Sequence, residues 1–357
     1  MRKNHWLAFI LIVAAVAACA SAYWWTGARK QNSSVLSFLP RDPAAVVYID
    51  FAALRQTTFL AQFAAWAPQP QKDPEYAQFL QDTGFDFERD LDHIAIATQK
   101  FGTASALTFI AEGKFDRKKI SAYALRNGKR QNANDREIFS VPLDAGKTTL
   151  SFTFVSDRLV VLTDSSNGLA DTLGALGKWP GESDWQQRFT RLAGAPVFAV
   201  VHQDAGAALA NKAPGGFRSP QLSSLLDQLQ WLTIAGKPGG DQLQIVAEGE
   251  CASETTSHQL ADLLNGVVIL AQTGLNDPKV RQQLNPEVRQ AYLDLLKGAD
   301  ISKLDRGETK AVRLVFSVTP AFLDAARASL PSQPAPSSPS NRGPQKHAAA
   351  PSRKSGT

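Results

Sequence analysis

The chain is predicted to be an α+β protein: an N-terminal transmembrane or signal helix, two related units of antiparallel sheet with helices on one face, and a disordered C-terminal tail. Three observations predict this arrangement. An uncharged apolar run occupies residues 6–25, a sequence block is repeated in the middle of the chain, and residues 331–357 are rich in proline and serine. The repeat places the first unit at 38–180 and the second at 181–330.

The apolar run WLAFILIVAAVAACASAYWW is long enough to cross a bilayer. As a helix its 20 residues would span roughly 30 Å, which matches the hydrocarbon thickness. Residues 1–5 contain Arg2 and Lys3 and no acid, as expected of a cytoplasmic segment before an anchor or signal. The sequence therefore predicts a single-pass protein of the cell membrane, with a linker at 26–37 and the body on the periplasmic or extracellular side.

Three fates of this run are open. Retention as a membrane helix is favoured by its length and by the aromatic residues 23–25 at its end. Cleavage after Ala22 is suggested by the small residues at 20–22, which resemble a signal-peptidase site. A lipoprotein-like sequence at 16–19 suggests lipidation of Cys19. All three place the body outside the cytoplasm.

The net charge of +5 comes from the two ends of the chain. Residues 1–30 and 331–357 each hold four Lys or Arg and no acid, which leaves 30 basic and 33 acidic residues, a net of −3, in residues 31–330. Nucleic-acid binding needs a clustered basic face, so a nucleic-acid partner is not predicted. The tail has six prolines and too little apolar surface to fold, so we expect it to be disordered.

The repeat is clearest between ALTFIAEGKFD (106–116) and QLQIVAEGECA (242–252), where Glu112 falls on Glu248. A short apolar run and a glycine-containing turn precede each block, so each copy is predicted to be a β-hairpin followed by a helix. The elements predicted for the first unit are a strand at 45–50, a helix at 51–66, the hairpin from 93, a helix at 117–125, strands at 137–141, 150–155 and 159–163, and a helix at 167–176. Those predicted for the second are a strand at 196–201, a helix at 204–212, the hairpin from 231, helices at 254–264, 278–284 and 286–297, strands at 301–304 and 311–318, and a helix at 320–329.

The repeated glutamates are the candidate site residues. If the two units face each other across a pseudo-two-fold axis, Glu112 and Glu248 would form a two-carboxylate site at their junction. The alternative is that both are ordinary strand-end residues beside a turn glycine. Cys19 and Cys251 predict no internal disulfide, and no histidine lies at metal-ligand spacing from another or from a cysteine. No catalytic residue, metal or cofactor is predicted, because the sequence holds no recognisable nucleophile or phosphate-binding motif.

The opening FLPRDPAAVVYID (38–50) resembles that of uncharacterised, membrane-anchored bacterial envelope proteins, in which a Leu-Pro-x-Asp segment follows the anchor and introduces a strand. The blocks GFDFERDLD (84–92) and AEGKFDRKKI (111–120) are similar to blocks of such proteins. The resemblance implies an exported α+β body and no activity, since the function of those proteins is unknown.

These observations predict a non-enzymatic, membrane-tethered envelope protein that presents a surface or cleft to an envelope protein, lipid or glycan. Two alternatives stay open. One is an envelope hydrolase with carboxylates at the junction of the two units, and the other is a lipid-binding protein with an internal cavity.

Overall fold

The computed structural model describes residues 34–329, apart from 41–42, 58–73, 102–103, 134–135, 144–147, 308 and most of 165–183 and 204–227. The apolar run with Cys19, the first part of the linker and the C-terminal tail all lie outside the described residues. Within the described part of the chain, no helix combines the length and the apolar composition that a membrane span requires.

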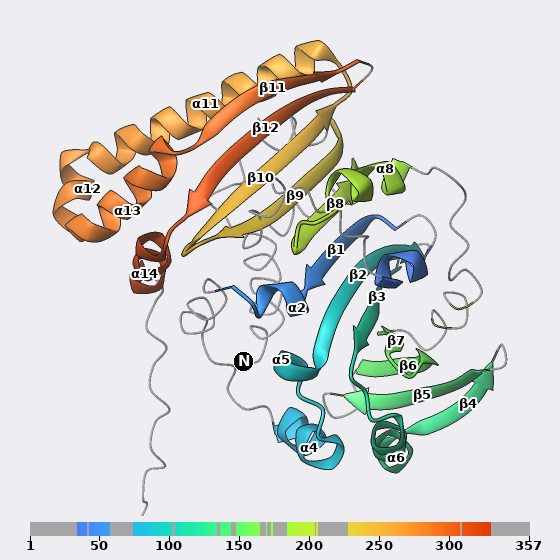
Figure 1. Ribbon diagram of the computed structural model, residues 1–357. Helices are drawn as coiled ribbons and strands as arrows, with labels where there is room; N and C mark the ends of the chain where they lie inside the picture. The colour runs from blue at the N-terminus through green and yellow to red at the C-terminus, as the bar shows by residue number, and fades with distance from the viewer. Residues whose placement is uncertain are drawn as a thin grey trace, which may run out of the picture.

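The described strands form one continuous antiparallel sheet (Figure 1). Its 12 strands lie in the order β11-β12-β10-β9-β8-β1-β2-β3-β7-β6-β5-β4. The strands are β1 (Ala45–Asp50), β2 (Leu91–Phe101), β3 (Ala104–Gly113), β4 (Lys129–Ala133), β5 (Arg136–Leu143), β6 (Thr148–Ser156), β7 (Leu159–Thr163), β8 (Val197–His202), β9 (Leu229–Gly239), β10 (Gln242–Cys251), β11 (Asp300–Arg306) and β12 (Thr309–Val318). The helices are η1 (Ser34–Phe38), a 3₁₀ helix, and α2 (Phe51–Leu54), α4 (Pro74–Thr83), α5 (Phe87–Asp90), α6 (Arg117–Asn127), α8 (Asp184–Arg191), α11 (Glu254–Asn276), α12 (Pro278–Gln283), α13 (Pro286–Lys297) and α14 (Pro320–Ser329).

The predicted fold class, two units with helices on one face, is wrong. β1 pairs directly with β8, with Tyr48 opposite Phe198, so the two halves of the chain share a single sheet. Helices also pack on both faces of this sheet, because η1 and α8 cover one face while α6, α11 and α14 contact the other. Tyr48 and Phe198 are 150 residues apart in sequence, and local patterns carry no information about so distant a pairing.

The strands of the two halves of the sheet are nevertheless connected in the same order. From the centre outward, one half is β1-β2-β3-β7-β6 and the other is β8-β9-β10-β12-β11. The first half continues into β5 and β4. Each central strand therefore leads to a hairpin. The third strand of each half leads through one or more helices to the outer strands, and the chain then returns to the fourth strand.

Standard local signals start the helices. The side chains of Asp50, Asp116 and Ser253 accept a backbone N–H three residues on, at the first turns of α2, α6 and α11. Pro278 and Pro286 stand at the starts of α12 and α13, where a missing N–H is harmless. The β9–β10 hairpin turns at Gly240, whose φ of 67° favours glycine.

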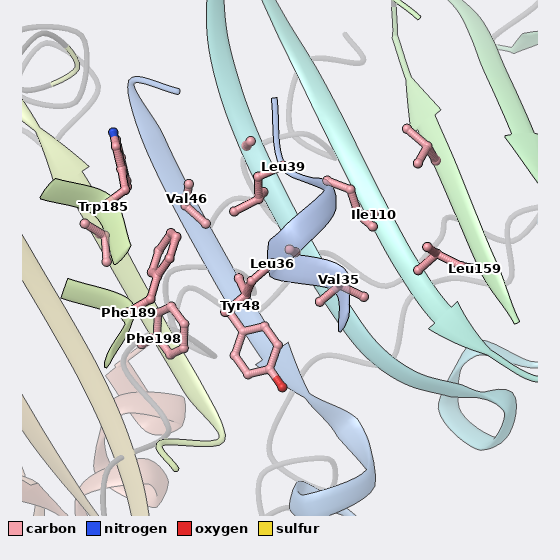
Figure 2. Close-up of a cluster of buried hydrophobic side chains, with 14 of the residues drawn as sticks. Val35, Leu36, Leu39, Val46, Tyr48, Ile110, Leu159, Trp185, Phe189 and Phe198 are labelled. Atoms are coloured by element: carbon pink, nitrogen blue, oxygen red, sulfur yellow. The ribbon is translucent and has the colours of Figure 1, made fainter. Parts of the chain in front are cut away.

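The largest core cluster lies over the central strands, under η1 and α8 (Figure 2). Val35 and Leu39 are fully buried there, beside Tyr48 of β1 and Ile110 of β3. From the other half of the chain, Phe189 of α8 and Phe198 of β8 belong to the same cluster. Val35 and Leu36, which lie in the segment predicted to be a linker, are therefore part of the core.

Leu39→Ala should lower the free energy of unfolding by about 2–5 kcal/mol, because it opens a cavity at the centre of this cluster. Denaturant unfolding followed by tryptophan fluorescence measures the loss. Leu125→Ala is the matched control, because Leu125 is 48% exposed and its truncation should leave stability nearly unchanged. Equal effects of the two changes would contradict this description of the core.

Candidate functional site

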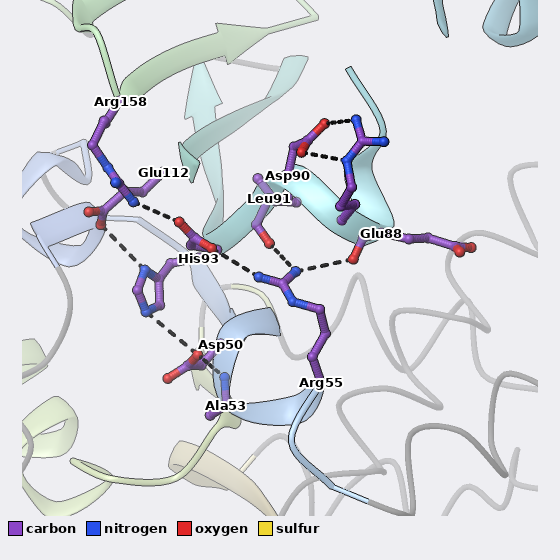
Figure 3. A network of polar contacts seen from close by, with 11 residues as sticks. Asp50, Ala53, Arg55, Glu88, Asp90, Leu91, His93, Glu112 and Arg158 are labelled. Carbon is purple, nitrogen blue, oxygen red and sulfur yellow. Dashed lines mark hydrogen bonds and ion pairs between the residues drawn. The ribbon is translucent and has the colours of Figure 1, made fainter. Parts of the chain in front are cut away.

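A row of polar side chains crosses three strands where β1 ends (Figure 3). Asp50 of β1 is opposite His93 of β2, and His93 is opposite Glu112 of β3. Directly paired residues point to the same face of a sheet, so the three side chains form one continuous row on the face that η1 covers. Their side chains are about one-fifth exposed.

His93 lies between the two carboxylates. Its Nε2 is 3.5 Å from Asp50 Oδ1, and its Nδ1 is 3.4 Å from Glu112 Oε2. The Nδ1 atom is buried and, within the described part of the chain, makes no hydrogen bond of good geometry. An imidazole with a carboxylate at each nitrogen can pass a proton between them or act as a base. Asp50 is held in place because its Oδ1 also accepts the Ala53 N–H at 2.7 Å.

A bulge beside the row turns Asp92 toward two arginines. The register of β2 and β3 shifts between Leu91 and His93, which leaves Asp92 unpaired in the ladder. Arg55 and Arg158 donate to its two carboxylate oxygens at 2.9 and 2.7 Å. Arg55 also donates to the carbonyl oxygen of Leu91 at 2.7 Å. These contacts join the end of α2 to the start of β7 and fix the ends of the row.

Asp90 fixes the short helix α5 next to this bulge. Arg89 donates two hydrogen bonds to its carboxylate, at 2.8 and 2.6 Å, and the Asp86 N–H donates a third at 3.0 Å. The Arg89 hydrogen bonds outweigh burial and lower the pKa of Asp90 to about 2. Asp90 is therefore ionised at neutral pH. Gly113 is required beside it, since a Cβ there would meet the Asp90 carbonyl oxygen at 2.4 Å.

The other half of the sheet has a row in the same position. His202 of β8 is opposite Trp231 of β9, and Trp231 is opposite Glu250 of β10. This row also adjoins a bulge, where the register shifts between Glu250 and Cys251. The chemistry differs, because Trp231 replaces the central histidine and packs edge-on against His202 with ring centroids 4.5 Å apart.

Helix α8 fills this second row with arginines. Arg188 and Arg191 both donate to the carboxylate of Glu250, whose side chain is 2% exposed. The Arg188 guanidinium also lies 3.8 Å from the centre of the Trp231 ring. Burial lowers the pKa of Arg188, and the hydrogen bond to Glu250 opposes this shift. The second row is thus a buried ion-pair cluster that attaches α8 to the sheet, whereas the first row is partly open to solvent.

The structure does not bring the two predicted glutamates together. β3 and β10 are five strand positions apart, which corresponds to roughly 24 Å at about 4.8 Å per strand. Glu112 belongs to the first polar row. Glu248 instead accepts hydrogen bonds from Arg306 and Arg313 at 2.7 and 2.8 Å. Burial would raise the pKa of Glu248, but these two arginines outweigh it and lower that pKa.

The sequence match was also two residues out of structural register. Glu112 and Glu250 occupy equivalent positions, each opposite the central residue of its row and next to a bulge. The shared Ala-Glu-Gly letters had aligned Glu112 with Glu248. At the corresponding strand ends, Leu91 is opposite Gly113 in the first half and Leu229 is opposite Cys251 in the second. Aligning the halves on these two pairs places Glu112 on Glu250. Asp50 and His93 were missed as site residues because strand pairing alone makes them neighbours.

The structure does not identify a reactive cysteine among the described residues. Cys251 is buried, and burial raises the pKa of its thiol, while Cys19 lies outside the described residues. In the described segments, no three His, Cys, Asp or Glu side chains are arranged to bind a metal ion.

The chain has a low structural similarity to some solved proteins. No family model matches the chain, and no curated protein matches it. Similar solved structures include crystal forms I, III and IV of TP0453, with 8%, 8% and 10% sequence identity and TM-scores of 0.44, 0.47 and 0.43. These matches cover 83%, 84% and 85% of this chain and 97%, 99% and 100% of TP0453.

Glu250→Gln should lower the free energy of unfolding by about 3–5 kcal/mol, because it removes the buried carboxylate that Arg188 and Arg191 share. Among the described residues Arg188 would keep the Asp184 carboxylate, which is 3.8 Å away and 72% exposed. Glu137→Gln is the matched control. It also removes a carboxylate that contacts two arginines, but the Glu137 side chain is 42% exposed and those of Arg117 and Arg130 are 48% and 51% exposed, so the loss should be about 1 kcal/mol or less. Thermal or denaturant unfolding of both variants measures the difference, and losses of equal size would show that Glu250 is not a buried anchor.

Proposed function

We propose that the chain is a non-enzymatic, membrane-tethered envelope protein whose sheet presents a surface to another envelope component. The observation that supports this proposal best is the position of η1. The uncharged run ends at Trp25, and Ser34 begins η1. The residues that follow, Val35 and Leu39, are fully buried against the centre of the sheet.

The short connection would hold the sheet close to the bilayer. Eight residues separate Trp25 from Ser34, and a fully extended chain of that length spans at most roughly 28 Å. Because η1 is packed into the core, the chain is fixed to one face of the sheet from Ser34 onward. A retained anchor would therefore present the sheet to the envelope at limited height and from a fixed point of attachment.

The surface best suited to a partner is the one around the first polar row. Asp50, His93 and Glu112 are partly exposed, and Arg158 beside them has a 58% exposed side chain. Mixed charges of this kind suit a polar envelope partner, either a protein or a glycan. The hydrolase alternative loses its candidate carboxylate pair, because Glu112 and Glu248 lie on strands five positions apart in the sheet.

Membrane fractionation of the full chain tests the tether. We expect the protein in the membrane fraction after an alkaline wash, and we expect external protease to digest the body in spheroplasts. Val16→Arg should release it or block export, since an arginine at the centre of a membrane helix costs about 2.5–3.5 kcal/mol. Leu125→Arg, an exposed control, should change neither result. A full-length chain in the cytosol would overturn the proposal.

The display role is tested with a photo-crosslinking amino acid at position 158, compared with one at Leu125. Position 158 lies beside the polar row, and Leu125 on α6 is also exposed. A single partner protein or glycan that crosslinks from position 158 and not from position 125 would support the proposal. Equal labelling from the two positions, or none from either, would contradict it.

A further inference from the structure

The second half of helix α11 has an unusual exposed surface. Leu270 is 72% exposed and Val267 is 43% exposed. The first half of the helix packs on the sheet through Leu260 and Ala261. From Leu263 to Asn276 the helix has no charged residue, although a solvent-facing helix of a monomer normally carries charges. Contiguous exposed apolar side chains of this kind mark interaction surfaces.

Two glycines lie on the same side of this helix. Gly266 and Gly274 are each four residues from Leu270, and residues four apart lie in one row along a helix. A Cβ at either glycine would meet nothing within 4 Å, so the fold of one chain does not require glycine there. Glycine also weakens a helix interior relative to alanine. Glycine is favoured where another backbone approaches closely.

The row is symmetric about Leu270, and this symmetry identifies the partner. We infer that α11 pairs with α11 of a second copy of this chain, antiparallel and centred on Leu270. In such a two-fold pair, Gly266 of one copy faces Gly274 of the other, and the two Leu270 side chains meet at the axis. Two-fold interfaces require this kind of self-complementary surface.

The charges at the ends of the row fit the same arrangement. An antiparallel pair centred on Leu270 brings Asp262 of one copy near the C-terminal end of α11 of the other, where α11 ends at Asn276 and α12 begins. Pro278 begins α12, which carries Lys279 and Arg281. Asp277 at the same end already caps α12, because its side chain accepts the Lys279 N–H at 2.8 Å. Each end of the pair therefore brings an acidic residue toward basic ones, with an uncharged contact between them.

The other flank of the helix is already occupied within the chain. Gln272 donates to the carbonyl oxygen of Leu296 on α13 at 3.2 Å, and Arg289 of α13 donates to Asn276 at 3.1 Å. The glycine row and the side that carries Ile269 are thus the parts of the second half that are left for a partner. The contact is short, about 12 Å of helix from Gly266 to Gly274 at 1.5 Å per residue, so the association should be weak and is best tested at cellular concentration.

Cysteine crosslinking of the full chain in intact cells tests the pairing. In a Cys19→Ser background, Leu270→Cys should form on the order of tenfold more disulfide-linked dimer than Ile269→Cys, because a disulfide needs Cα atoms within about 7 Å. Ile269 is the matched control, since it is 61% exposed but points about 100° away around the helix. Equal crosslinking from the two positions would overturn the inference.

A second pair of variants separates pairing from folding. Adding Gly266→Leu to Leu270→Cys should abolish most of the crosslink, while the melting temperature of the chain stays the same or rises. Unchanged crosslinking in this variant would contradict close backbone contact. If Leu270→Cys is shielded from a water-soluble maleimide without crosslinking, its partner is a bilayer or another protein, and the second-copy pairing is wrong. The pairing does not rest on the membrane tether, which fractionation of the same cells reports separately.

Discussion

The pairing of β1 with β8 is the contact on which the rest of the structure depends. It joins the two halves of the chain edge to edge, from Ala45 opposite Val201 to Ile49 opposite Val197. The side chains above this junction come from both halves, and η1 and α8 cover them together. Without this pairing, β1 and β8 would each expose a row of backbone groups and an apolar face. The two halves are therefore expected to fold as one cooperative body.

The two polar rows have the same strand arrangement but different structural roles. Both rows lie beside a bulge and both contain a glutamate on the third strand, Glu112 or Glu250. In the second half, α8 adds two arginines and the row becomes a buried attachment point. In the first half a histidine occupies the centre of the row, with its Nδ1 3.4 Å from Glu112 Oε2. The first row is consequently the one that keeps partly exposed, titratable groups.

Local structure was predictable from the sequence to a considerable degree. The strand at 45–50 and the helices at 286–297 and 320–329 have the predicted bounds, because alternation, caps and helix-starting prolines act over a few residues. The helix predicted at 254–264 extends to Asn276. The extension was missed, and residues 263–276 carry no charged residue that would mark a polar helix face. The continuity of the sheet was missed because the β1–β8 contact joins segments about 150 residues apart, a separation at which sequence patterns carry no signal. Helix α8 was not predicted either, so the two arginines that bind Glu250 were also missed.

Native-state hydrogen exchange of the backbone amides in β1, β2, β8 and β9 tests the single-sheet description most directly. If the β1–β8 pairing unites the molecule, the most protected amides on both sides of the junction should exchange through the same opening, with a free energy equal to that of global unfolding. If β8 and β9 exchange through an opening that leaves β1 and β2 protected, the halves unfold separately and the description of one cooperative sheet is wrong.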